Sequence, residues 1–271
     1  MSAAAQNRAA PGRRRGRLFL CRLRLAFGFF TILPFSGAGP ISEVAGAAYL
    51  LPVIGAVLGA IEGLVAWGSV RLFGSLVAGA AALAAALLLT GLHHADGLAD
   101  VGDAVMAHGS RCRRLQVLKD QTLGIGAAGA LLITYLLSWA AIAQLAFLRH
   151  GAVLVGLLAA AEVCARTALI FAAALSRPSH AGSGSEFIMT LRGKSGAAGF
   201  AAAFLILAGL ALPLGVAALA SALAAALLTA ALVAAAARRL FGGAGGDVLG
   251  ATLELARMIC LLALLLALNV L

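Results

Sequence analysis

The sequence predicts an all-α fold, a polytopic integral membrane bundle of about seven transmembrane helices. The chain of 271 residues is 63% hydrophobic and only 11% charged, and its mean hydropathy is +1.05. Soluble domains carry about a quarter of their residues as charged side chains, so the composition excludes that class. Apolar stretches that can cross a bilayer, each of about 20 residues, recur along the whole chain.

The N-terminal segment is expected to differ from the rest. Residues 1–17 predict a disordered basic tail, and residues 18–271 predict a single membrane-embedded catalytic domain. Within that domain, residues 18–33 predict a basic helix that lies at the membrane interface or inserts partly. A basic segment beside an integral membrane body favours contact with anionic membrane lipid. Because that body contains no soluble basic domain, nucleic acid is not an expected partner.

Seven candidate spans follow in order, at residues 45–70, 74–92, 125–148, 151–175, 196–212, 215–237 and 248–270. Pro213 and Gly215 predict the break between the fifth and sixth spans, since Pro and Gly together end a helix. The loops after the second, fourth and sixth spans hold most of the Arg and Lys residues between spans. The positive-inside rule therefore predicts that the N-terminus and these three loops face the cytoplasm.

The loop after the second span holds the strongest site candidate. Asp96, Asp100 and Asp103 are spaced i, i+4, i+7, which places three carboxylates on one face of a helix. Like charges stacked in this way repel each other unless a cation lies against them. Mg²⁺ prefers carboxylate oxygens and usually binds a phosphate group as well. The three aspartates therefore predict a Mg²⁺ site.

Further candidates lie in the same loop and in the other cytoplasmic loops. The predicted catalytic residues are His94, Lys119 and Asp120. The predicted substrate-binding residues are Arg111, Arg114, Gly124, Arg166, Arg177, Lys194, Gly242, Gly243, Gly246, Asp247 and Glu254. The Gly- and Ser-rich loop that follows Arg177 suits a mobile lid over an anionic ligand, and Asp247 suits the cap of the last helix.

Two ionisable residues lie inside a predicted span. Glu162 and Arg166 share an i, i+4 face of the fourth span. Charged residues at such depth are rare, usually pair, and often line a polar cavity. A structural ion pair and a pair that faces the substrate both fit this pattern, and Glu62 in the first span is a candidate for the same cavity.

Three motifs resemble the cobalamin synthase family, and they occur in the family's order. They are H-x-D-G-L-A-D-x-x-D from His94 to Asp103, K-D-x-x-x-G from Lys119 to Gly124, and G-G-x-x-G-D-x-L-G-A-x-x-E from Gly242 to Glu254. With T-x-L-P at Thr31 to Pro34, the resemblance covers most of the chain from Thr31 onward. The chain departs from the family at Ala104 (usually Gly), Gly245 (usually Thr) and Arg257 (often acidic).

The resemblance implies an enzyme that joins adenosylcobinamide-GDP to α-ribazole or its 5′-phosphate. The products would be adenosylcobalamin or its phosphate, and GMP. It also implies Mg²⁺ as cofactor and a multi-pass position in the bacterial inner membrane. Both a homo-oligomer and a complex with other enzymes of the pathway remain open.

Two other functions compete with this interpretation. A phospholipid synthase of the CDP-alcohol phosphatidyltransferase type also uses a D-G-x-x-A motif, but it expects Arg where Asp100 stands and a second half with G-x-x-x-D-x-x-x-D that is missing here. An ion-coupled transporter would place its acidic site near the bilayer midplane, often in repeated halves. The acids here lie in a loop, and no repeat is visible.

Overall fold

The computed structural model describes residues 11–35, 39–120 and 122–270. That part of the chain contains no β-sheet and only one isolated β-bridge, between Pro178 and Ala244. The helices are α1 (Pro11–Phe30), α2 (Ile41–Ala47), α3 (Leu51–Leu89), α4 (His93–Met106), α5 (Arg111–Val117), α6 (Ile125–Leu148), α7 (Gly151–Leu175), α8 (Ser183–Leu191), α9 (Lys194–Leu214), α10 (Val216–Leu240) and α11 (Gly246–Val270), with a 3₁₀ turn η1 (Ala48–Leu50) before α3. The predicted all-α class is confirmed.

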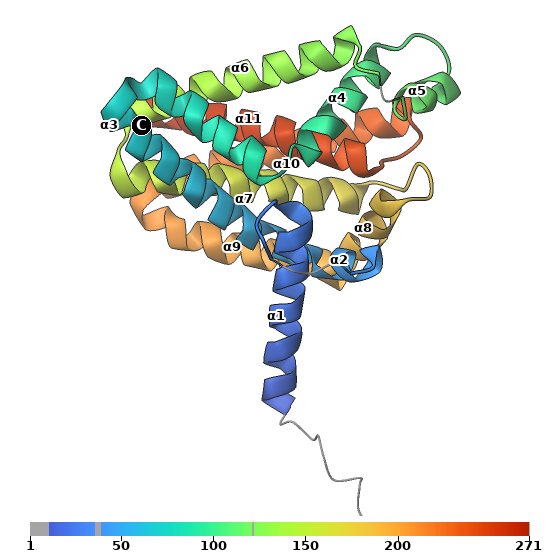
Figure 1. Cartoon of the computed structure of the whole chain (residues 1–271), viewed down its shortest axis with the longest axis horizontal. Helices are drawn as coiled ribbons and strands as arrows, with labels where there is room; N and C mark the ends of the chain where they lie inside the picture. The colour runs from blue at the N-terminus through green and yellow to red at the C-terminus, as the bar shows by residue number, and fades with distance from the viewer. Residues whose placement is uncertain (1–10, 36–38, 121, 271) are drawn as a thin grey trace, which may run out of the picture.

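Among the described residues, six stretches are long and apolar enough to cross a membrane, and the first of them, Ile41–Leu89, has 49 residues. Inside it α3 reverses at Gly74, whose φ of +79° is a conformation that favours glycine. The first limb runs antiparallel to α7, and the second runs antiparallel to α6, so the two limbs form a helical hairpin (Figure 1). The bundle therefore contains the seven predicted crossings.

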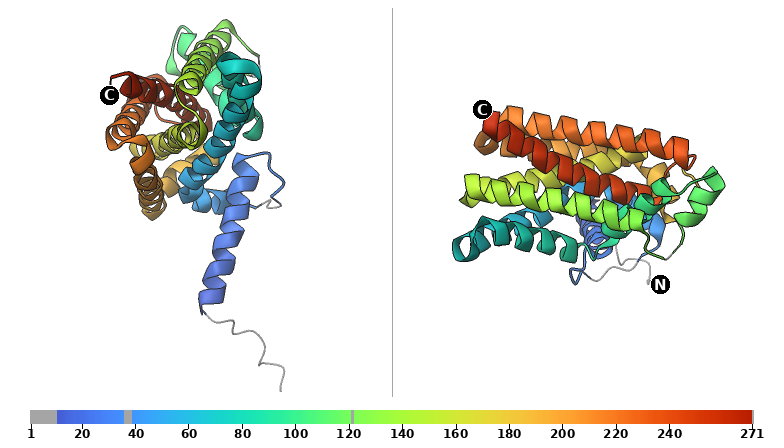
Figure 2. Two further views of the ribbon diagram at one scale, coloured as in Figure 1. Left: turned by 90° about the vertical axis from the view of Figure 1, so that its left-hand side faces the viewer. Right: turned by 90° about the horizontal axis from the view of Figure 1, so that it is seen from above.

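Small residues let the first limb of α3 lie directly on α7. A Cβ at Gly55 would lie 2.8 Å from the backbone oxygen of Glu162, and one at Gly59 would lie 2.6 Å from the Cα of Ala159. Such close approach is how helices associate in lipid, where packing replaces the hydrophobic effect. Helix α7 is consequently the centre of the bundle, with 89% of its most apolar window buried, and the end view shows it enclosed by the other spans (Figure 2).

The boundary between α9 and α10 lies where the sequence predicts it. Helix α9 includes Pro213 in its last turn and ends at Leu214, and Gly215 adopts a φ of +86° before α10 begins. The alanines of α10 then recur every three or four residues on its buried face, as Ala218, Ala222, Ala226, Ala230, Ala234 and Ala237. This stripe faces the bundle and lets α11 pack closely.

Helix α1 projects from the bundle across the direction of the spans (Figure 1). Near its C-terminal end Leu25, Phe27 and Phe30 are buried against the body, whereas Phe19 is 47% exposed. The expected helix at 18–33 is present, and it runs from Pro11 to Phe30, so it includes the last residues of the predicted tail. The rest of the predicted disordered tail, residues 1–10, lies outside the described residues.

The packing of α3 on α7 predicts the effect of adding one methyl group. Gly59→Ala should lower the free energy of unfolding by about 1–3 kcal/mol, because its Cβ would meet backbone atoms that cannot move independently. The measurement is a denaturant titration of the purified protein in mixed micelles. Gly68→Ala on the same helix is the control, since its Cβ would meet nothing within 4 Å. Equal stability of the two variants would contradict the packing described here.

Candidate functional site

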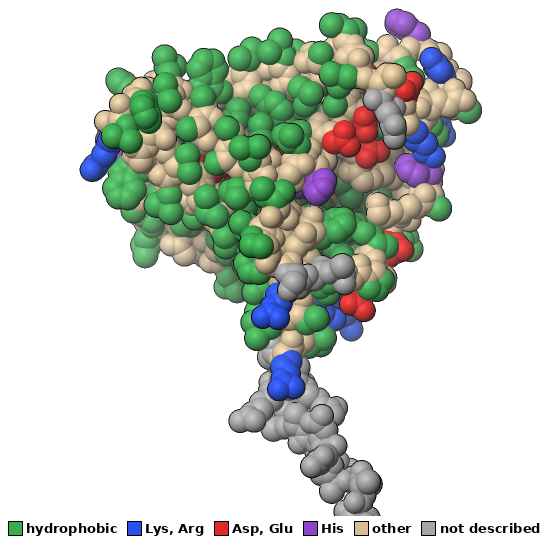
Figure 3. Space-filling view, in the orientation of Figure 1, with side chains coloured by type: hydrophobic (Ala, Val, Ile, Leu, Met, Phe, Trp, Pro, Cys, Tyr) green, Lys and Arg blue, Asp and Glu red, His purple; other side chains and the backbone are tan. Residues whose placement is uncertain are grey.

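The three aspartates of the predicted metal site lie on α4, at one end of the bundle. The chain leaves α3 through Leu92, which has a left-handed φ of +61°, and α4 begins at His93. Asp96 lies in the first turn of α4 and is exposed, while Asp100 and Asp103 are half-buried. Figure 3 shows acidic side chains gathered in one patch on this side of the molecule. The predicted shared helical face is therefore present.

A fourth carboxylate joins this patch from α11. A Cβ at Gly97 would lie 2.7 Å from the backbone oxygen of Asp247, so the first turn of α11 rests directly on α4. Burial, and then the charges of Asp96, Asp247 and Asp103, raise the pKa of Asp100 to about 6. Asp247 was expected to cap the last helix, but α11 begins at Gly246 and Asp247 lies inside its first turn. We define Asp96, Asp100, Asp103 and Asp247 as the acidic cluster.

Asp103 has a structural function that the sequence did not indicate. Its carboxylate accepts hydrogen bonds from the backbone N–H of Gly124, at 2.7 Å, and of Ala127, at 2.8 Å. These donors belong to the N-terminal turn of α6, where the helix has no internal acceptors for them. Asp103 and Gly124, predicted as metal and substrate ligands, therefore join α4 to α6.

The acidic cluster offers the carboxylate oxygens that Mg²⁺ prefers, but it does not supply a complete set of protein ligands. Within the described residues, no group of three or more His, Cys, Asp and Glu side chains is arranged to hold a metal ion. Mg²⁺ commonly takes one or two carboxylates and completes its shell with water and substrate phosphate. Asp96 and Asp100, one helical turn apart and not used as helix caps, fit that requirement.

Lys119 and Asp120 lie apart from the acidic cluster. Among the described residues, neither forms a hydrogen bond or an ion pair with a carboxylate of the cluster. Both are exposed in the loop between α5 and α6. Asp120 accepts hydrogen bonds from the hydroxyl of Thr122, at 2.8 Å, and from its backbone N–H, at 3.1 Å. These bonds hold the pKa of Asp120 below its usual value. A weakly basic, exposed carboxylate is a poor candidate for the predicted catalytic base.

Two of the predicted arginine ligands have different surroundings. Arg114 donates from Nη1 to the backbone oxygens of Ala104, at 2.9 Å, and Val105, at 2.6 Å, so it caps the C-terminal end of α4. Arg111 is exposed and lies over Gly242, since a Cβ added there would be 3.1 Å from its Nη1. Of the two, Arg111 remains available to an anionic ligand.

The glycine-rich loop before α11 pairs with the loop after α7. The backbone N–H of Ala244 donates to the oxygen of Arg177 at 2.8 Å, and that of Ser179 donates to the oxygen of Ala244 at 3.0 Å. Gly243 is needed for this pairing, because a Cβ there would overlap the backbone of Arg177. Gly246 is exposed, and a Cβ there would meet nothing within 4 Å. Gly243 therefore packs against the backbone of Arg177, and only the side-chain position of Gly246 is open.

The segment predicted as a mobile lid is a helix. Helix α8 buries Phe187, Ile188 and Leu191, and its Gly184 packs on the backbone of Gly246. Apolar burial along one face fixes this segment against the bundle. Lys194, at the start of α9, lines a separate hollow with Arg22 and Tyr49, away from the acidic cluster.

Five charged residues, on α3, α7 and α11, form a buried network inside the bundle. Arg166 pairs with Glu162, and Arg257 pairs with Glu254 and, at 3.4 Å, with Glu162; each of these residues is at most 2% exposed. Glu62, only 1% exposed, lies within electrostatic range of all four. Arg166 and Glu254, predicted as substrate ligands, are thus parts of a structural ion network. Arg257, where the family often has an acid, supplies the partner of Glu254.

His94 lies between this network and the acidic cluster. Its side chain is buried, and its Nδ1 has no hydrogen-bond partner among the described residues. Burial, followed by the positive charges of Arg166 and Arg257, lowers the pKa of His94 to about 3. The imidazole is therefore neutral near pH 7. It remains suited to hydrogen bonding.

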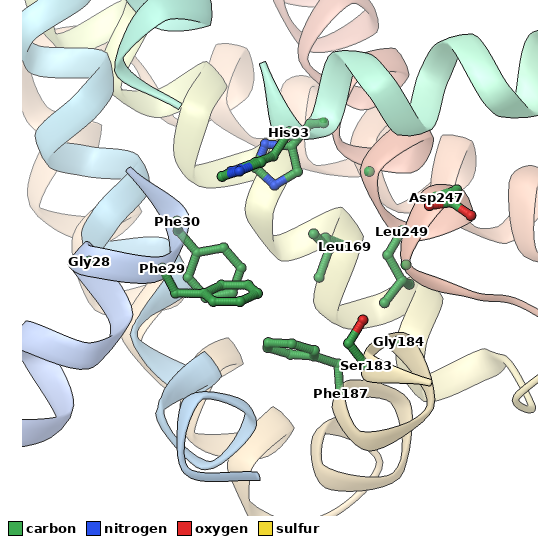
Figure 4. A pocket seen from close by; sticks show the side chains of 13 residues that line it. Gly28, Phe29, Phe30, His93, Leu169, Ser183, Gly184, Phe187, Asp247 and Leu249 are labelled. Atoms are coloured by element: carbon green, nitrogen blue, oxygen red, sulfur yellow. The ribbon is translucent and has the colours of Figure 1, made fainter. Parts of the chain in front are cut away.

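A cavity of about 440 Å³ opens beside the acidic cluster (Figure 4). Asp247 and His94 line it on one side, and Phe29, Phe30 and Phe187 line it on the other. These three phenylalanines could not be predicted from the sequence, because apolar residues on α1 and α8 resemble ordinary membrane or core contacts. His180, from the Gly- and Ser-rich loop, lies against the glycine-rich loop, with its ring 3.0 Å from where a Cβ of Gly245 would be.

Comparison with known proteins finds one family and many relatives. A sequence model described as cobalamin-5-phosphate synthase matches residues 22–265. An adenosylcobinamide-GDP ribazoletransferase of Methanococcoides burtonii is 30% identical over 93% of this chain and 94% of its own length. Those of Halorubrum lacusprofundi and Bradyrhizobium diazoefficiens are 40% and 34% identical, over 90% and 93% of this chain and 96% of each relative. No solved structure matches the chain significantly.

The buried network predicts a large effect of removing its shared carboxylate. Glu162→Gln should lower the free energy of unfolding by about 3 kcal/mol, because Arg166 loses its ionised partner in a dry interior and Arg257 keeps only Glu254. Denaturant titration in mixed micelles measures the change. Glu43→Gln, on the exposed surface of α2, should leave stability unaltered. Similar stability of both variants would mean that the network contributes little.

The burial of Asp100 and the repulsion within the acidic cluster together predict a pH effect in EDTA. Because the folded pKa of Asp100 is about 6 against an ordinary 3.8, ionisation is harder in the folded state, and stability should fall as pH rises from 4 through 6. Asp100→Asn cannot ionise and should lack this fall, so it should melt at a higher temperature than the parent at pH 7.5. Melting curves at pH 5 and pH 7.5 make the comparison. Identical pH profiles would show that Asp100 is not under electrostatic repulsion.

Proposed function

The chain belongs to the cobalamin-5-phosphate synthase family, and on that premise we propose that it transfers the cobinamide phosphate of adenosylcobinamide-GDP to α-ribazole or its 5′-phosphate. The reaction gives adenosylcobalamin or its phosphate and releases GMP. The chain is a multi-pass membrane transferase of cobalamin synthesis. The observation that carries the finer proposal is the acidic cluster, in which four carboxylates from two distant motifs meet at one end of the bundle.

Asp96 and Asp100 are the proposed ligands of Mg²⁺. A bound Mg²⁺ would neutralise negative charge on the diphosphate and on the departing GMP. Asp103 is not included, since both of its oxygens accept hydrogen bonds from α6. Its function in this proposal is to hold α4 so that Asp96 and Asp100 keep their orientation.

The transfer forms one phosphorus–oxygen bond and breaks another. The ribazole hydroxyl oxygen attacks the phosphorus on the cobinamide side, and the bond from that phosphorus to GMP breaks. Asp247 is the proposed acceptor of the hydroxyl proton, because it belongs to the acidic cluster and also lines the cavity. Neutral His94 supplies a hydrogen bond there, and the exposed Arg111 is the proposed partner of the phosphate oxygens.

The active-site end is proposed to face the cytoplasm of a bacterial inner membrane. Most basic residues of the loops lie at the end of the bundle that holds α4 and α5. They are Arg111, Arg113, Arg114, Arg177, Arg192, Arg238 and Arg239. The connections at the opposite end contain Arg71 and Arg149. This asymmetry supports the orientation through the positive-inside rule. A homo-oligomer, or a complex with other enzymes of the pathway, remains a prediction.

The test of the proposed reaction uses membranes that contain the full chain. Incubation with adenosylcobinamide-GDP, α-ribazole and Mg²⁺ should give adenosylcobalamin and an equal amount of GMP, measured by chromatography. EDTA should stop the reaction, and added Mg²⁺ should restore it. Product formation in EDTA would refute the metal assignment. Formation of phospholipid from CDP-diacylglycerol, or substrate flux in proteoliposomes without GMP release, would favour the competing functions.

The individual aspartates are tested by substitution in the same assay. Asp100→Asn should lower kcat about 100-fold or more, because charge on the leaving group is no longer neutralised. Asp120→Asn is the matched control and should keep activity within about twofold, since Asp120 is exposed and bonded to Thr122. Near-normal GMP release by Asp100→Asn would overturn its assignment.

A further inference from the structure

The cavity beside the acidic cluster has two chemically different sides. Phe29 and Phe30, near the end of α1, and Phe187 of α8 form an aromatic wall. Across from them lie His93 and Asp247, which also line the cavity, and Figure 4 places them on the side away from the phenylalanines. A ligand in this cavity would therefore have one flat apolar part and one polar part.

The aromatic wall is a defined arrangement of rings. The ring centroids of Phe29 and Phe30 are 5.0 Å apart, and those of Phe29 and Phe30 each lie 5.7 Å from Phe187. Phe30 and Phe187 are buried, whereas Phe29 is 39% exposed and borders the opening. Rings packed in this way present faces and edges on which another aromatic ring can stack.

We propose that this cavity is the binding site for the aromatic base of the nucleoside acceptor. The inference rests on the proposed function, in which α-ribazole is that acceptor. Its base is a fused ring with methyl groups and few hydrogen-bonding atoms, which suits the phenylalanine wall. Its ribose, which carries the attacking hydroxyl, then points toward Asp247 and the acidic cluster.

The other ligand groups of the reaction fit this cavity poorly. Guanine carries several donors and acceptors along its edge, and leaving them unpaired against phenylalanine is costly. A substituted corrin ring is far larger than a nucleoside, and a cavity of about 440 Å³ has no room for it. The acceptor nucleoside is the substrate whose size and polarity match.

The site also assigns a function to α1. Two of the three rings in the wall come from the end of this helix, which otherwise projects away from the bundle. The chain after α1 is tied to the end of α3 by a hydrogen bond from the backbone N–H of Ile32 to the oxygen of Leu89, at 2.8 Å. Helix α4 begins a few residues after Leu89, so the aromatic wall and the acidic cluster are held together.

The test compares substitutions of the wall with a control in the purified protein. Phe29→Ala should raise the KM for α-ribazole about tenfold, as expected when one stacking partner of a base is lost, and leave the KM for adenosylcobinamide-GDP within about twofold. Phe187→Leu, which keeps an apolar side chain in the buried position, should raise the KM for α-ribazole less. Phe147→Ala is the control, because that ring is exposed on α6 away from the cavity.

A second measurement does not depend on turnover. Equilibrium dialysis of α-ribazole against the parent protein should show binding that Phe29→Ala weakens about tenfold and Phe147→Ala does not. Unchanged α-ribazole binding in Phe29→Ala and Phe187→Leu would overturn the proposal, as would a rise in KM confined to adenosylcobinamide-GDP. A parent protein that forms no adenosylcobalamin would instead refute the proposed function.

Discussion

The close contact between α4 and α11 is the constraint on which the rest of the site depends. The contact is possible because Gly97 has no side chain where the backbone of Asp247 passes. A Cβ at Gly97 would lie only 2.7 Å from the backbone oxygen of Asp247. On the next turn of α11, Gly250 faces α4 in the same way, with His94 as its neighbour. Two motifs that are far apart in the sequence thereby place their carboxylates around Asp100. A larger residue at Gly97 would push Asp247 away from the three carboxylates of α4.

The buried ion network sets the electrostatic environment beneath this contact. Arg166 and Arg257 carry positive charge into an interior where an unpaired charge is costly. Glu162 and Glu254 offset that cost. Burial, and then the positive charges of Arg166 and Arg257, lower the pKa of His94 and keep its imidazole neutral near pH 7. The sequence shows the charged residues but not which helices they join.

Hydropathy and spacing predicted much of the fold. The seven crossings, the break at Pro213 and Gly215 and the shared face of Asp96 and Asp100 were all available from the sequence, because each depends on a local pattern. The functions of Asp103 and Arg114 were not, because capping depends on which helix end a side chain meets in three dimensions. The aromatic wall was missed for a similar reason. Its rings come from separate segments, and neither segment carries a distinctive motif.

The hairpin at Gly74 has a consequence for how the protein is made. One residue joins the two limbs of α3, so the first span has almost no loop beyond the bilayer, and the connection carries little charge apart from Arg71. We therefore expect the two limbs to enter the membrane together as one hairpin, since so short a connection keeps them side by side from the moment both are made.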